Sequence, residues 1–145
     1  MRAVLVVPVL ALLTLTGCVP IGFACPAIGY TSVAHVTLAE PQPGLTLQLC
    51  DGEGCEPGPP MQPVEIASPG ATAEPVLETG VFEITGDSAT GWTAVFSGGQ
   101  PVIGYRLLDK NGMTVTQGGL EVEWVRVGGD ERCGGPREAE IELPV

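Results

Sequence analysis

The sequence is poor in the side chains on which catalytic and metal sites depend. It has one histidine among 145 residues, and 6 lysines and arginines against 17 aspartates and glutamates, which gives a formal net charge of −11. A chain this acidic cannot displace the cations that surround a nucleic acid, and it is not attracted to anionic lipid. No Gly-x-Ser-x-Gly motif is present, so a hydrolase of the Ser-His-Asp type would have to use His35, which lies within a predicted strand.

The sequence also lacks an apolar run long enough to cross a membrane, which takes about 20 residues. The apolar run near its start extends from Ala3 to Leu13 after the single basic residue Arg2, and Pro8 interrupts it. A short basic start and an apolar centre of this length are typical of a secretory signal peptide and not of a retained anchor. We therefore expect residues 1–17 to be removed during export.

The segment Leu15-Thr16-Gly17-Cys18 resembles the lipobox of bacterial lipoprotein precursors. The resemblance covers residues 1–18 and implies that the thiol of Cys18 is diacylglycerylated and that the chain is cut just before it. Lipid would then hold the protein on the outer side of the cell membrane. The alternative is an ordinary secretion signal in which Cys18 carries no lipid. A composition rich in Gly and Pro, with Lys110 as its one lysine, also resembles that of lipoproteins from GC-rich bacteria such as actinomycetes.

Removal of 17 residues from 145 leaves 128, which is enough for one domain with its own core. We expect a short tether at 18–24 and a single, monomeric domain at 25–145. Fully extended, the six residues between Cys18 and Cys25 span about 20–25 Å, so the domain would lie close to the membrane. Because the signal contains Arg2 and no acid, the formal net charge of the mature chain is −12.

Four cysteines remain if Cys18 is lipidated, and an even number in an exported domain predicts two disulfides. Three pairings are possible, and we favour Cys50 with Cys55 because glycines between them permit a sharp turn. Cys25 then pairs with Cys133 and closes a loop of over a hundred residues, which stabilises a fold by about 4–5 kcal/mol in the chain-entropy model. The competing interpretation is a metal site, which the single histidine and the lack of a Cys-x-x-Cys motif disfavour.

Short runs with period-two alternation follow one another along the mature chain, and Gly and Pro clusters separate them. No amphipathic helix is evident, so the pattern predicts an all-β fold: a two-sheet antiparallel sandwich of about eight short strands. It loosely resembles immunoglobulin-like, fibronectin type III and transthyretin-like modules. The predicted strands are residues 30–39, 45–50, 64–66, 81–84, 92–96, 102–109, 113–117, 120–124 and 138–143, with a weak edge strand at 76–77.

Two hairpins are expected from the turn residues. The runs 30–39 and 45–50 could pair across the Pro/Gly segment between them, and Asn111-Gly112 is a strong hairpin signal between 102–109 and 113–117. The alternation of residues 120–124 changes phase after Trp124, which suggests a bulge there.

Two of the predicted strands carry alternating glutamates on one face. If those strands pair, five carboxylates would line one side of a sheet, either as a cation-binding patch or as a solvated outer face. Like charges directly opposite one another are destabilising, so arginines, solvent or a cation must compensate. The glutamates are Glu121, Glu123, Glu138, Glu140 and Glu142, and the candidate arginines are Arg106, Arg126 and Arg137.

The loops Asp51–Pro63 and Gly128–Pro136 are the segments expected to carry specificity, because sandwiches present function on loops. Candidate ligand-facing residues are Asp51, Glu53, Trp92 and Trp124, although the two tryptophans could equally pack in the core. We expect no metal, cofactor or catalytic residue. The interpretation is a non-enzymatic, lipid-anchored module that binds an envelope protein or polysaccharide or assists envelope assembly. The alternatives are an envelope hydrolase that uses His35 or a glutamate pair, and a structural spacer.

Overall fold

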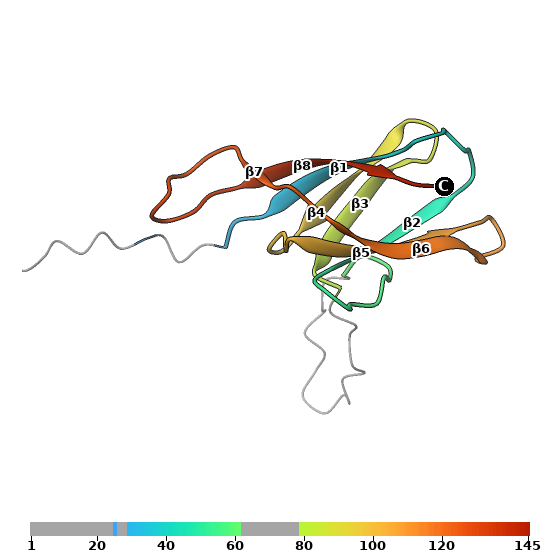
Figure 1. The fold of residues 1–145 in the computed structure, drawn as a ribbon, viewed down its shortest axis with the longest axis horizontal. Helices are drawn as coiled ribbons and strands as arrows, with labels where there is room; N and C mark the ends of the chain where they lie inside the picture. The colour runs from blue at the N-terminus through green and yellow to red at the C-terminus, as the bar shows by residue number, and fades with distance from the viewer. Residues whose placement is uncertain (1–24, 26–28, 62–78) are drawn as a thin grey trace, which may run out of the picture.

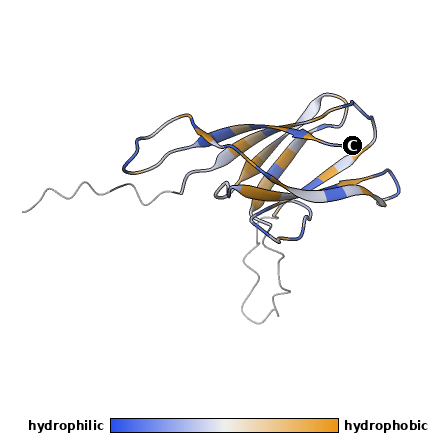
Figure 2. Cartoon of the chain, viewed as in Figure 1, coloured by the Kyte–Doolittle hydropathy of each residue, from blue (hydrophilic) through white to orange (hydrophobic). Residues whose placement is uncertain are grey.

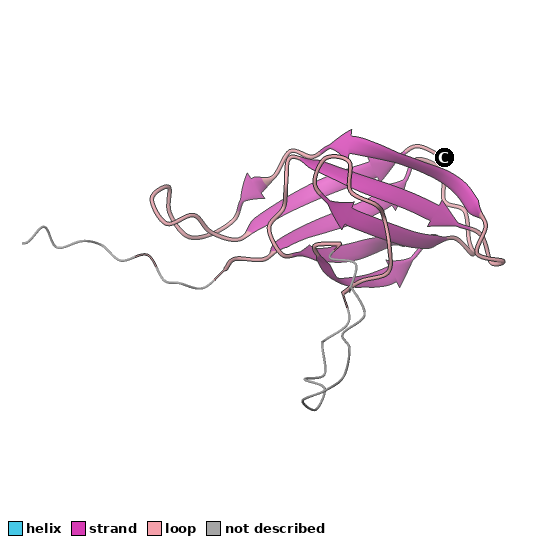
Figure 3. Cartoon of the chain, turned by 90° about the horizontal axis from the view of Figure 1, so that it is seen from below, coloured by secondary structure: helices cyan, strands magenta, loops and turns pink. Residues whose placement is uncertain are grey.

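The structure is a computed structural model that describes residues 25, 29–61 and 79–145. The predicted signal, Cys18, the tether and the strands expected at 64–66 and 76–77 lie outside the described residues. The described part is an all-β, sandwich-like fold of eight strands without a helix, as predicted (Figure 1, Figure 3). The strands are β1 (Ser32–Leu38), β2 (Thr46–Asp51), β3 (Val81–Asp87), β4 (Gly91–Phe96), β5 (Val102–Leu108), β6 (Thr114–Glu121), β7 (Val125–Arg126) and β8 (Arg137–Leu143).

The strands form a five-stranded sheet of order β3-β4-β1-β8-β7 and a three-stranded sheet of order β2-β5-β6. Neighbouring strands are antiparallel except β1 and β8, which pair in parallel from Ser32 opposite Arg137 to Leu38 opposite Leu143. A parallel pair needs a long connection between its strands. Here the connection between β1 and β8 is almost the whole domain. The first and last strands of the sandwich therefore lie side by side.

The hairpin expected between residues 30–39 and 45–50 does not form. β1 pairs with β4 and β8, whereas β2 pairs with β5, so the intervening turn carries the chain from one sheet to the other. The alternation correctly predicts which side chains are buried, but it does not determine which strand lies alongside. The second hairpin is confirmed, because β5 and β6 pair antiparallel across Asn111-Gly112.

The core lies between the two sheets and is built from alternate residues of their strands. Hydrophobic segments (orange) lie on strands of both sheets in Figure 2. The alternate apolar residues of β8, which are Ala139, Ile141 and Leu143, are buried, and so are Leu47 and Leu49 of β2. The buried cluster comprises Ala34, Val36, Leu38, Leu47, Leu49, Val81, Trp92, Ala94, Phe96, Ile103, Tyr105, Leu107, Val122, Ala139, Ile141 and Leu143.

The segment after β6 crosses between the sheets. β6 ends at Glu121, and the chain joins the five-stranded sheet at β7. Val122 is buried, but Val125 and Val127 are 59% and 51% exposed. The predicted bulge near Trp124 is therefore wrong, because the apparent change of phase reflects two valines that face solvent. The irregular registers lie instead in the pairing of β3 with β4 and of β5 with β6.

Both disulfides have the favoured pairing. Cys25 is joined to Cys133 across 108 residues, and Cys50 to Cys55 across 5. The carboxylate of Asp130 accepts a hydrogen bond from the Cys133 backbone N–H at 2.7 Å, which fixes the turn that carries this cysteine. A Cβ on Gly129 would collide with the carbonyl of Gly134, so this turn closes only with glycine there.

The turn between β5 and β6 is held by Asp109. Its carboxylate accepts hydrogen bonds from the backbone N–H groups of Asn111 and Met113, both at 2.8 Å. These bonds, with that from Met113 the largest cause, lower the pKa of Asp109 below its ordinary value of 3.8. The ionised form of Asp109 is therefore the one that stabilises the native turn.

A carboxyl group with a lowered native pKa stabilises a fold above its unfolded pKa, and that contribution is lost as the pH falls through the native pKa. We expect Asp109→Asn to flatten the fall in the midpoint of urea unfolding between about pH 4 and pH 2. The exposed Glu40→Gln is the control, and it should leave the curve unchanged. Identical acid curves for Asp109→Asn and the unmodified chain would contradict this account.

Candidate functional site

The two tryptophans predicted as possible ligand contacts serve packing. Trp92 is 5% exposed and belongs to the core. The ring of Trp124 meets Phe96 edge-on, with centroids 5.5 Å apart, and its indole N–H donates to the carbonyl of Gln100 at 2.7 Å. Trp92 is therefore buried in the core, whereas Trp124 packs against the core and stays partly exposed.

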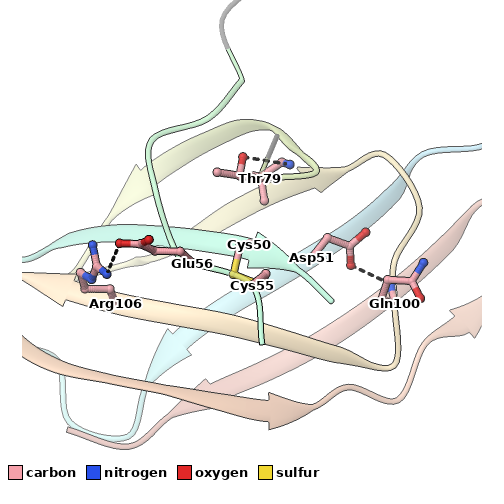
Figure 4. Close-up of a disulfide and its surroundings, with 8 residues drawn as sticks. Cys50, Asp51, Cys55, Glu56, Thr79, Gln100 and Arg106 are labelled. Carbon is pink, nitrogen blue, oxygen red and sulfur yellow. Dashed lines mark hydrogen bonds and ion pairs between the residues drawn. A yellow bond between two sulfur atoms is a disulfide. The ribbon is translucent and has the colours of Figure 1, made fainter. Parts of the chain in front are cut away.

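Asp51 organises a loop. Its carboxylate oxygens accept hydrogen bonds from the backbone N–H groups of Gly99 at 3.1 Å and Gln100 at 2.7 Å, and Figure 4 shows the bond to Gln100. Its own backbone N–H donates to the carbonyl of Thr79 at 2.8 Å. Asp51 thus fixes the turn between β4 and β5, whereas Glu53 is exposed in the loop closed by Cys50 and Cys55.

That disulfide loop lies on the outer face of the three-stranded sheet. A Cβ on Gly104 of β5 would lie 2.6 Å from the Sγ atom of Cys50 and 3.3 Å from that of Cys55. Only a residue without a side chain therefore lets the disulfide pack this closely. Gly58 continues the loop along β2 and donates to the carbonyl of Leu49 at 3.4 Å. A glycine in the middle of a strand marks a close approach of another part of the chain. Gly104 was therefore a signal in the sequence from which this packing could have been predicted.

A hollow of about 450 Å³ opens beside this loop, and we call it the loop hollow. At its rim the Arg106 guanidinium lies 3.4 Å from the Glu56 carboxylate and also donates to Gln117 at 3.3 Å (Figure 4 shows the ion pair). The loop was predicted from the sequence to carry specificity, but the strand residues that complete the site were not predicted. The lining consists of Gly52, Gly54, Cys55, Glu56 and Pro57 from the loop, Val102, Ile103, Gly104, Tyr105 and Arg106 from β5, and Gln117, Gly118 and Gly119 from β6.

The loop hollow is suited to binding. Its glycines leave backbone groups accessible, and its rim offers one cation, one carboxylate and one amide. The Glu56 side chain is 71% exposed, so solvent screens its ion pair with Arg106 and leaves both groups free to exchange partners. His35 lies in the other sheet, where its Nδ1 is 3.4 Å from the Thr93 hydroxyl.

The glutamate strands do not pair with each other. β6 belongs to the three-stranded sheet and β8 to the five-stranded sheet. The glutamates nevertheless line two hollows, one between β8 and the segment that follows β6, and one between β6 and β8. Among the described residues, no three His, Cys, Asp or Glu side chains are arranged to hold a metal ion. One hollow, of about 500 Å³, is lined by Glu123, Val125, Val127, Glu138, Ala139 and Glu140, and the other, of about 320 Å³, includes Glu121, Glu123, Glu140 and Glu142.

The predicted arginine partners of these glutamates lie elsewhere. Arg106 pairs with Glu56, and Arg126 lies directly opposite Arg137 where β7 meets β8. The exposed glutamates Glu121, Glu140 and Glu142 form no ion pair with another described residue.

No family model matches the chain, and neither a curated protein nor a solved structure matches it. None of the described residues form a helix with the length and hydropathy that crossing a membrane requires.

The close packing of the disulfide on Gly104 generates a prediction. We expect Gly104→Ala to lower the free energy of unfolding by about 1–3 kcal/mol, because the new methyl group overlaps Cys50 Sγ. Gly119→Ala is the matched control on the next strand, since its Cβ would meet only the Ile103 carbonyl at 3.6 Å.

Guanidinium unfolding of both variants should be measured again with Cys50 and Cys55 replaced by Ala. In that background the cost of Gly104→Ala should fall to that of the control, because the sulfur atoms are gone. An equal cost for Gly104→Ala with and without the disulfide would show that the sulfur atoms are not the constraint.

Proposed function

We propose that this chain is an exported, lipid-anchored, non-enzymatic binding module of the bacterial cell envelope that holds a partner protein in the loop hollow. The lipobox resemblance at Cys18 supports the anchor. The two disulfides support export, because such bonds persist in oxidising compartments and are rare in the cytosol.

The observation that carries the proposal is the disulfide between Cys25 and Cys133. Six residues separate Cys18 from Cys25, so the folded domain stays within about 20–25 Å of a lipid on Cys18. β1 and β8 begin side by side, at Ser32 and Arg137, so both segments that lead to this disulfide enter the sandwich at the same end (Figure 1). In the anchored protein, this end faces the membrane.

The chemistry of the loop hollow favours a protein partner over a polysaccharide. The tryptophans are packed against the core, and the floor of the hollow exposes peptide groups next to β6, an edge strand that pairs with β5 alone among the described strands. Extended peptides bind such edges through main-chain hydrogen bonds. A hydrolase based on His35 is the less supported alternative, because His35 and the loop hollow lie on different sheets.

The anchor is tested by the intact mass of the protein extracted from bacterial membranes. We expect the mass of the chain from Cys18 plus acyl groups, and a gain of four hydrogens on reduction because two disulfides open. Cys18→Ser should remove the acyl mass and release the protein from the membrane. Retention of residues 1–17, or a mass without lipid, would refute the anchor.

The binding surface is tested by a photo-crosslinking residue at Gln117 in whole cells. Gln117 lines the loop hollow, and Thr85 is an exposed position on β3 that serves as the control. We expect a discrete protein adduct from position 117 and none of that size from position 85. Indistinguishable adduct patterns at the two positions would exclude the loop hollow as the specific surface.

A further inference from the structure

The hollow of about 320 Å³ between β6 and β8 has a composition unlike that of the loop hollow, and we call it the acidic hollow. It lies where the two sheets part: β6 has no partner beyond β5 among the described strands, and β7 pairs with only Arg137 and Glu138 of β8. Its volume equals that of about ten water molecules. The residues that matter here are Tyr105, Leu120, Glu121, Glu140, Ile141 and Glu142.

Tyr105 places an oxygen atom at this hollow. Its side chain points inward from β5 and is 5% exposed, and its ring extends across β6 at Gly118. A Cβ on Gly118 would lie 3.2 Å from Cε1 of Tyr105 and 3.3 Å from its hydroxyl oxygen. The ring is thus seated in the core with its hydroxyl oxygen beside Gly118 of β6, and Tyr105 is one of the residues that line the hollow.

The Tyr105 hydroxyl makes no hydrogen bond with any described residue. Among these residues, no polar side-chain atom is both fully buried and without a partner. The hydroxyl must therefore contact solvent, and the acidic hollow is the opening on the inner side of β5 where its side chain lies. A buried tyrosine whose hydroxyl faces solvent can accept a hydrogen bond from a donor group of a ligand.

The glutamates that line the hollow are also without positive partners among the described residues. Glu121, Glu140 and Glu142 are exposed and form no ion pair with a described residue. They give the hollow an uncompensated negative potential in a chain that is already strongly acidic. Leu120 and Ile141 add apolar carbon to the lining.

We propose that the acidic hollow binds an alkylammonium group, supplied by a free polyamine or by a lysine side chain of a basic partner. An ammonium group offers three N–H donors on a flexible aliphatic stem. The donors suit the Tyr105 hydroxyl and the surrounding carboxylates, and the stem suits Leu120 and Ile141. A metal ion suits the hollow less well, because the described acidic side chains do not converge as ligands.

The test is a titration of the isotopically labelled chain, purified as its host produces it, by two-dimensional amide NMR. We expect cadaverine to shift the amides of residues 119–123 and 140–142, and its uncharged analogue 1,5-pentanediol to leave them unchanged. Added salt should weaken the binding, since exposed charges contribute to it. Nα-acetyl-lysine amide is the second arm: binding comparable to that of cadaverine assigns the site to lysine side chains, and much weaker binding assigns it to free diamines.

Two variants decide whether the site is specific. Tyr105→Phe should weaken cadaverine binding about tenfold through loss of a hydrogen bond to a charged group, whereas Tyr30→Phe should not. Glu140→Gln should weaken it about threefold. Glu83→Gln removes the same charge from exposed β3, on the opposite edge of the sheet, and should have no effect.

Cadaverine binding that is unaffected by Tyr105→Phe would overturn the proposal, and so would equal losses for Glu140→Gln and Glu83→Gln, because both results indicate diffuse attraction to an acidic surface. If the spectrum of Tyr105→Phe loses its dispersion, the comparison of the two glutamate variants decides the question alone. The inference does not depend on the lipid anchor or on the loop hollow, so its failure leaves the proposed function standing.

Discussion

The structure depends on the position of β1 at the centre of the larger sheet, where it pairs antiparallel with β4 and parallel with β8. Its inward residues Ala34 and Val36 are fully buried, so the strand contributes to the core as well as to both pairings. The disulfide between Cys25 and Cys133 joins the segments that precede β1 and β8. It thereby strengthens the same junction that the parallel pairing makes, and the rest of the five-stranded sheet extends outward from it.

In the smaller sheet, the backbone lies close to a neighbouring side chain at two glycines. Gly104 admits the disulfide of the loop, and Gly118 admits the ring of Tyr105. One glycine acts on the outer face of the sheet and the other on its inner face. Both line the loop hollow, and the Tyr105 ring that Gly118 admits also lines the acidic hollow. The absence of a side chain at these positions thus shapes both surfaces, while Asp51 holds the adjoining turn in place.

The fold class, the inward residues of β8 and the pairing of four cysteines could be predicted from the sequence, because alternation, turn residues and an even cysteine count report on local constraints. The neighbours of β1 could not be predicted, since period-two alternation specifies a buried face and not a partner. The site was predicted in part. The loop that follows Asp51 was indicated by its glycines and prolines, but the role of Tyr105 depends on Gly118 of the adjacent strand, and register across strands is not local. The change of phase after Trp124 was misinterpreted as a bulge, because the alternating Val125 and Val127 have the pattern of a buried strand face although both are exposed.

The parallel pairing of the first and last strands also governs when the domain can be completed. Leu143, two residues from the end of the chain, is fully buried against the core. A chain grows from its N-terminus, so β1 is made about 100 residues before the strand that must lie beside it, and pairing over such separations is slow. Synthesis must therefore reach Leu143 before the larger sheet can close. Until then β1 lacks its parallel neighbour, and the larger sheet stays incomplete while the residues between the two strands are made.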